Sequence, residues 1–105
     1  STLATETNTD YTGTTIDGVT LTGTDIATNK AGQLRIYASK GVITLNSGAK
    51  KMTKIEFTFS SEEYAGVLEA EGYSDGVWTG NASEVTFSNT GKQARVKKMV
   101  ITVVE

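Results

Sequence analysis

The sequence predicts an all-β fold, a β-sandwich or jelly roll built from antiparallel strands. Val, Ile and Thr supply 33 of the 105 residues (9, 6 and 18), against five Leu and two Met. β-Branched side chains are stiff at χ1 and pack well on a pleated surface, whereas helices favour unbranched residues. Apolar and polar residues alternate in several segments, and eleven glycines help to separate them. These observations predict seven or eight short strands around one core.

The chain has the length of a single domain, and we expect residues 1–105 to be one module of a larger multidomain protein. Residues 1–8 are polar and rich in Thr, which predicts a linker or a terminal strand. Residues 14–16 and 19–22 are predicted to form a hairpin. Asp17-Gly18 between them supplies the two positive φ angles that a type I′ turn requires.

The next part of the chain alternates between loops and short strands. Residues 23–32 are polar and predict a loop. A strand over 33–37 follows, and its alternation places Arg35 and Tyr37 on the outward face. A further strand is predicted over 42–45.

The clearest strand spans residues 52–60. Ile55, Phe57 and Phe59 point one way, and charged or hydroxyl residues point the other way. A period of two over this length indicates a strand with one buried face, so we assign these two Phe residues to the core.

The rest of the chain is predicted to supply three more strands, one connector and one loop. They are a connector over 61–64, a short strand over 66–70, a glycine-bounded loop over 72–76, and strands over 84–88 and 93–104. In the last strand Val96 is out of phase with Met99 and the apolar residues that follow. This slip predicts a β-bulge at Lys97-Lys98.

The composition excludes several classes of function. The chain has no His and no Cys, so a Ser-His-Asp triad, a Cys nucleophile and a His/Cys zinc site are impossible. Ten basic residues against twelve acidic ones give no broad positive field, which argues against a nucleic-acid partner. No apolar run is long enough to insert into a membrane as a helix. A deep catalytic cleft does not fit this length, and we expect no enzymatic activity.

Charges are unevenly distributed in the C-terminal half. Residues 55–91 contain seven acidic residues and no basic one, whereas residues 92–98 contain four basic residues. One interpretation is that an acidic strand pairs with a basic strand. The alternative is an acidic rim around a ligand-binding loop.

Four sequence segments resemble a known family: MTKIEFTF (52–59), Tyr64-Ala65-Gly66, WTGNASEVTF (78–87) and ARVKKMVITVV (94–104). They resemble a β-sandwich module of gut and rumen bacteria that is appended to polysaccharide-processing proteins. More loosely, the chain is similar to the galactose-binding-like jelly rolls, which include many carbohydrate-binding modules. The resemblance covers about residues 33–104. It implies an extracellular or cell-surface accessory module that binds polysaccharide or oligosaccharide beside a tethered catalytic domain.

A sugar ring presents an apolar C–H face to aromatic planes and a rim of hydroxyl groups to polar side chains. The predicted planes are Tyr73, Trp78, Tyr64 and Tyr37, and the predicted polar partners are Glu62, Glu63, Asp75 and Arg35. Trp78 has an alternative role as a core residue whose indole N–H bonds to a backbone carbonyl. Glu62 and Glu63 are alternatively two solvated side chains on a connector.

The expected ligand is a plant cell-wall-type polysaccharide of the β-glucan, xylan or mannan class. A protein-interaction or spacer module of a bacterial surface protein is the rival function. No organic cofactor is expected. The resemblance allows a structural calcium ion, and Asp10, Asp17 and Asp25 lie in loop-like segments, although no compact Asp-x-Asp run exists.

Overall fold

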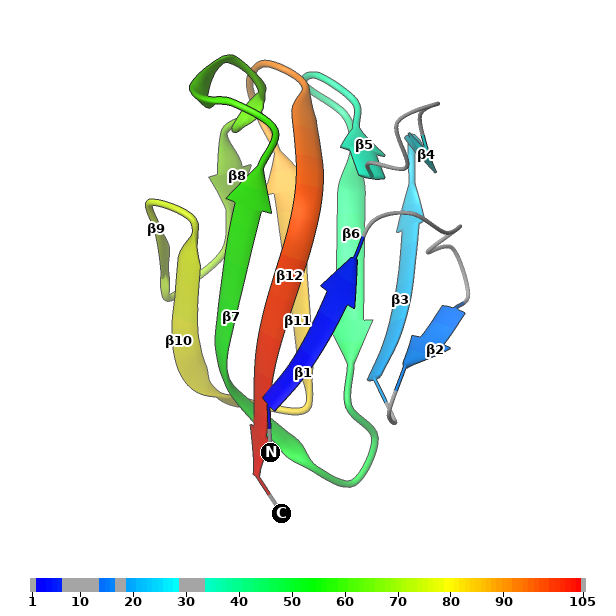
Figure 1. Cartoon of the computed structure of the whole chain (residues 1–105), viewed down its shortest axis with the longest axis vertical. Coiled ribbons are helices and arrows are strands. Elements are labelled where there is room, and N and C mark those ends of the chain that lie inside the picture. The colour runs from blue at the N-terminus through cyan, green and yellow to red at the C-terminus, as the bar shows by residue number, and fades with distance from the viewer. Residues whose placement is uncertain (1, 7–13, 17–18, 29–33, 105) are drawn as a thin grey trace.

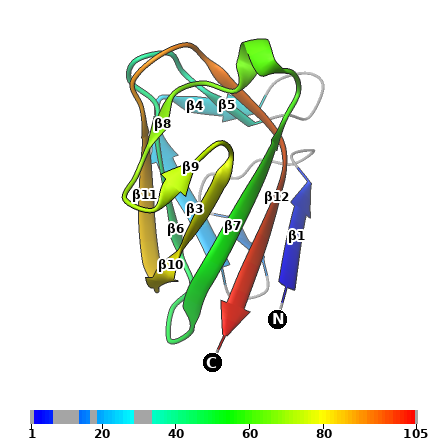
Figure 2. The ribbon, with the colours of Figure 1, turned by 90° about the vertical axis from the view of Figure 1, so that its left-hand side faces the viewer.

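The computed structural model describes residues 2–6, 14–16, 19–28 and 34–104. Two antiparallel sheets pack against each other (Figure 1, Figure 2), which confirms the predicted all-β sandwich. The jelly-roll connectivity stays a prediction. No helix in the described part of the chain is long and apolar enough to cross a membrane.

The larger sheet, sheet A, has seven strands in the order β4-β5-β12-β7-β10-β9, and β1 adds to β12 off this path. Its strands are β1 (Thr2–Glu6), β4 (Ile26–Thr28), β5 (Leu34–Ile36), β7 (Lys51–Phe59), β9 (Tyr73–Ser74), β10 (Val77–Ala82) and β12 (Ala94–Val104). The N-terminal segment that predicted a linker or a terminal strand therefore contains a strand. It lies antiparallel to β12, with Thr2 opposite Thr102.

The smaller sheet, sheet B, has five strands in the order β2-β3-β6-β11-β8. They are β2 (Thr14–Ile16), β3 (Val19–Thr24), β6 (Val42–Asn46), β8 (Leu68–Glu69) and β11 (Glu84–Asn89). The predicted hairpin is confirmed by the pairing of Ile16 with Val19, and its turn, 17–18, lies outside the described residues. The predicted loop over 23–32 is wrong for residues 23–24, which end β3, and for β4. Asp25 adopts a φ of 53°, which lets the chain bend from one strand into the next.

The core lies between the sheets and is formed by inward residues of both. Its largest fully buried side chains are Phe87, Leu34, Ile36, Ile43, Leu45, Met52, Ile55, Met99, Ile101 and Val96. The bulge predicted at Lys97-Lys98 is confirmed by a register shift between Val96 and Lys98. A second bulge was not predicted. At this bulge Lys54 lies opposite Thr102 and Met52 lies opposite Val103, so Thr53 is the extra residue of β7. Met52 and Ile55 are therefore both buried although they are three residues apart.

After β7 the chain forms a short 3-10 helix, η1 (Glu62–Tyr64), and crosses to sheet B as β8 before it returns to sheet A as β9. Figure 2 shows this crossing on the open side of the sandwich, where β8 and β9 lie in front of the core. The crossing separates two hollows on that side. The first lies beside η1, and the second lies beside the turn between β10 and β11.

Candidate functional site

The β9–β10 hairpin places two of the predicted aromatic residues opposite each other. Tyr73 pairs with Trp78, and Ser74 pairs with Val77. Asp75 and Gly76 form the two-residue turn, with φ of 48° and 83°, as a type I′ turn requires. The prediction of a loop over all of 72–76 is therefore wrong, because residues 73–74 form β9. The Asp-Gly signature that identified the first hairpin is present here as well.

Trp78 is a core residue, so the prediction that it offers a stacking plane is wrong. Its side chain is only 4% exposed, and Nε1 donates to the Glu71 carbonyl at 2.8 Å. Gly72 and Gly80 lie against the indole. A Cβ added at Gly80 would stand 2.6 Å from Trp78 Cζ2. The absence of side chains at these glycines lets backbone cover the ring, and the alternative role as a core residue applies.

Tyr73 is half-buried rather than fully exposed. Its ring makes edge-on contacts with Phe57 and Phe87, at centroid distances of 5.8 and 5.5 Å. Burial raises the pKa of the Tyr73 hydroxyl, a hydrogen bond with the Gly76 backbone opposes this, and the Asp75 charge adds to it. The hydroxyl therefore stays protonated at neutral pH.

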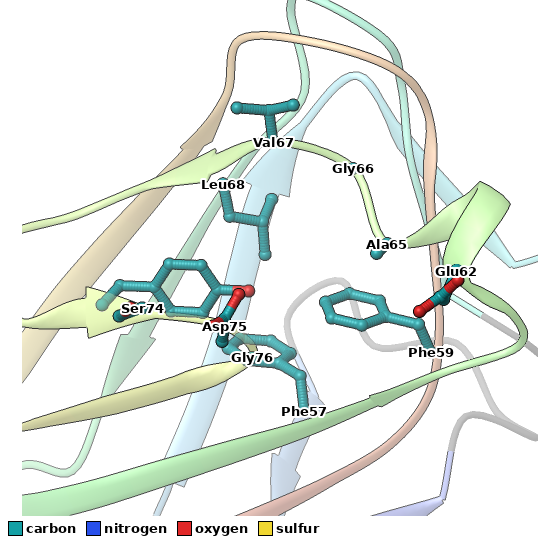
Figure 3. Close-up of a pocket in the computed structure, with 11 residues that line it drawn as sticks. Phe57, Phe59, Glu62, Ala65, Gly66, Val67, Leu68, Ser74, Asp75 and Gly76 are labelled. Atoms are coloured by element: carbon teal, nitrogen blue, oxygen red, sulfur yellow. The ribbon is translucent and has the colours of Figure 1, made fainter.

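Beside η1 lies a hollow of about 460 Å³, which we call the aromatic cavity. It is lined by Phe57, Phe59, Glu62, Ala65, Gly66, Val67, Leu68, Tyr73, Ser74, Asp75 and Gly76. Figure 3 shows Phe57, Phe59 and Leu68 around a common space, with Asp75 on one side and the Glu62 carboxylate beside Phe59. Its volume falls within the range of sites that hold small ligands, about 300–1,000 Å³. Tyr73, Glu62 and Asp75 are the predicted site residues that meet here.

Phe59 lines the cavity although the sequence did not predict it as a site residue. Alternation along β7 assigned it to the core, and its ring does stack on Phe57 at 5.8 Å with an interplanar angle of 8°. Phe57 is buried, whereas Phe59 stays half-buried at the last position of β7. A ring at the end of a strand reaches the edge of the core, and strand position was the only signal that could have identified it.

Asn89 fixes the segment around Val67, which forms one wall of the aromatic cavity. This side chain is 2% exposed, and its Nδ2 donates to the carbonyls of Ile36, Tyr37 and Lys92 at 3.0, 3.2 and 2.8 Å. Its Oδ1 accepts from the N–H groups of Val67 and Gly91 at 3.1 and 3.2 Å. The amide thus links sheet A, sheet B and the turn that leads into β12. Neighbouring Val67 is 46% exposed at the rim.

The other predicted site residues do not enter this cavity. Glu63 is exposed on η1, and half-buried Tyr37 has Lys40 Nζ 5.9 Å from its ring centroid. Tyr64 lies against Arg95, whose Cζ is 3.8 Å from the ring centroid. Arg35 lies on β5, opposite Arg95 of β12.

The basic segment meets the acidic one at η1, through a backbone carbonyl and an aromatic ring. Lys92 Nζ donates to the backbone carbonyl of Glu62 at 2.9 Å, and Arg95 lies over the Tyr64 ring. An ion pair within the strand joins Lys54 to Glu56 at 3.7 Å. These contacts leave the Glu62 carboxylate at the rim of the aromatic cavity.

The calcium prediction rested on three Asp residues, two of which, Asp10 and Asp17, lie outside the described residues. Asp25 is exposed, and Lys40 Nζ lies 4.0 Å from its carboxylate. Within the described ranges, no group of three or more His, Cys, Asp or Glu side chains could hold a metal ion.

No family model, curated protein or solved structure matches this chain. The likeness to carbohydrate-binding modules therefore stays a prediction.

Proposed function

We propose that this chain is a non-catalytic carbohydrate-binding module, an accessory domain of a secreted or cell-surface bacterial protein. Its ligand would be a plant cell-wall-type polysaccharide of the β-glucan, xylan or mannan class. The observation that carries the proposal is the aromatic cavity, which combines two half-buried rings, Phe59 and Tyr73, with two exposed carboxylates, Glu62 and Asp75.

The cavity offers both kinds of contact that a sugar requires. The rings supply apolar surface, and burial of about 100 Å² of such surface contributes about 2–3 kcal/mol. The carboxylates accept hydrogen bonds from sugar hydroxyls, and the protonated Tyr73 hydroxyl can donate one, each contributing about 1 kcal/mol. After the costs of association, dissociation constants from about millimolar to micromolar follow. Tethering to a catalytic domain would strengthen such weak binding through effective concentration.

The rival function is a protein-interaction or spacer module, and the burial of Trp78 favours it. In that case the rings around the cavity only complete the core. The two functions differ in one requirement, because a sugar site needs at least two accessible side chains that face the same space. Phe59 and Tyr73 meet this requirement, since both are half-buried and both line the cavity.

Affinity electrophoresis in gels that contain xylan, mixed-linkage glucan, mannan or xyloglucan tests the proposal. We expect at least one polysaccharide to retard the protein. Glu62→Gln should weaken retardation because Glu62 lines the cavity, and Glu63→Gln is the matched control on the same helix. Free migration through every gel, or equal loss in both variants, would favour the spacer function.

A further inference from the structure

Two arginines lie side by side on the outer face of sheet A. Arg35 of β5 is directly opposite Arg95 of β12, and the residues on either side of each are buried. Side chains alternate along a strand, so both arginines face away from the core. Directly opposed residues have Cβ atoms about 4.5–5.5 Å apart, and like charges in such positions destabilise a sheet. A pairing of this kind calls for a compensating negative charge.

Arg95 is held in place by its neighbours. Tyr64 lies against its guanidinium group, at 3.8 Å from Cζ to the ring centroid, and Nε donates to Gln93 Oε1 at 3.0 Å. Both contacts order the side chain, and neither partner carries a negative charge. A guanidinium group that is fixed before binding loses little freedom when a ligand arrives.

Arg35 differs from Arg95, because its Nε–H group is an unpaired hydrogen-bond donor within the described structure. Its Nε is buried and has no hydrogen-bond partner among the residues that the structure describes. Leaving a buried donor unpaired is costly, so this N–H favours any acceptor that can reach it. The residue opposite Arg35 on β4 is Ala27, whose side chain offers no hydrogen-bond acceptor.

We propose that Arg35 and Arg95 bind the anionic group of an acidic sugar, a uronate carboxylate or a sulfate ester. Planar guanidinium groups form paired, charge-assisted hydrogen bonds with such oxyanions. The site adjoins the aromatic cavity through η1, because Tyr64 contacts Arg95 while Glu62 lines the cavity. The inference rests on the proposed function and narrows its ligand to a glycan that carries acidic units. Of the three proposed classes it favours xylan with uronate side groups, because β-glucans and mannans are neutral.

NMR spectroscopy of the arginine Nε–Hε groups tests this assignment directly. The probes are tri-galacturonate, its methyl ester and a sulfated galactose, all titrated at constant ionic strength. We expect tri-galacturonate or the sulfated sugar to shift the Arg35 signal, and the uncharged ester to leave it unchanged. The sugar that shifts it identifies the anion. Loss of one charge-assisted hydrogen bond in Arg35→Gln should weaken binding about ten-fold or more.

Lys54→Gln is the matched control, since it removes the same charge from the outward side of β7. The free energy of unfolding should not fall in Arg35→Gln, because the like-charge contact is relieved. Equal binding of tri-galacturonate and its ester, or equal loss in Arg35→Gln and Lys54→Gln, would overturn the inference. Neutral glycans that still bind at the cavity would then leave the proposed function standing. Equally strong binding of poly-L-glutamate would overturn the assignment to a glycan.

Discussion

The aromatic cavity and the hollow below the β8–β9 crossing are of similar size but offer different chemistry. The second hollow, which we call the Trp78 groove, has about 530 Å³ and is lined by Ala70, Glu71, Gly72, Trp78, Thr79, Gly80, Asn81, Ala82, Glu84, Val85 and Thr86. Its one large ring is covered by glycine backbone, and its indole N–H is already bonded. In the aromatic cavity Phe59 and Tyr73 keep part of their rings open beside carboxylates. A hollow is a candidate site when its rings keep exposed surface beside exposed polar groups, whatever its volume.

The largest expected loss of stability comes from removing the Trp78 indole, which lines the groove and is covered by glycine backbone. Trp78→Ala should lower the free energy of unfolding by about 3–5 kcal/mol, because it empties a buried site and frees the β8–β9 crossing. Trp78→Phe keeps most of the ring and loses the bond to Glu71, so it should cost less. Urea denaturation measures both. A loss below about 1 kcal/mol in Trp78→Ala would mean that the indole does not hold the crossing.

A smaller loss is expected from removing the Asn89 amide, which supports the wall of the aromatic cavity but not the Trp78 groove. Asn89→Ala leaves buried carbonyl and N–H groups without partners and should cost about 2–4 kcal/mol. Hydrogen exchange should accelerate at the Val67 amide, while that of Thr79, which donates to Gly72 beside the groove, stays slow. Equal acceleration at both amides would show that the two hollows are not independently supported.

Phe59→Ala separates binding from stability. Because Phe59 is half-buried, we expect a loss of about 1–3 kcal/mol in unfolding free energy, together with weaker retardation by polysaccharide. Gly80→Ala provides the contrast, because its new Cβ would crowd the indole and destabilise the groove without touching the cavity. If both variants reduce retardation in proportion to their loss of stability, the cavity is not the binding site.

The fold was largely predictable because its strands follow simple alternation. Leu34, Ile36, Val85 and Phe87 are buried as their period requires, and the bulge after Val96 was evident from the break in that period. The bulge at Thr53 was not evident, because it depends on the register of β7 against β12.

The candidate site was less predictable than the fold, because exposure depends on tertiary packing. Trp78 and Tyr73 are cross-strand partners with equally glycine-rich surroundings, yet only one is fully covered. The proximity of Glu62, Asp75 and Phe59 arises from the β8–β9 crossing, which joins segments that no local pattern connects.

The smallest predicted effect concerns pH and distinguishes Tyr73 from Trp78, which does not titrate. The folded protein raises the pKa of Tyr73 above its usual 10.0, so the folded state holds the phenolic proton more tightly than the unfolded chain does. The resulting stability is complete below pH 10.0 and is lost as pH rises through the higher folded pKa. Between about pH 9 and about pH 11, urea midpoints should therefore fall more for the wild type than for Tyr73→Phe. Equal falls would mean that the Tyr73 hydroxyl is as well solvated in the folded protein as in the unfolded chain, in contrast to the buried indole of Trp78.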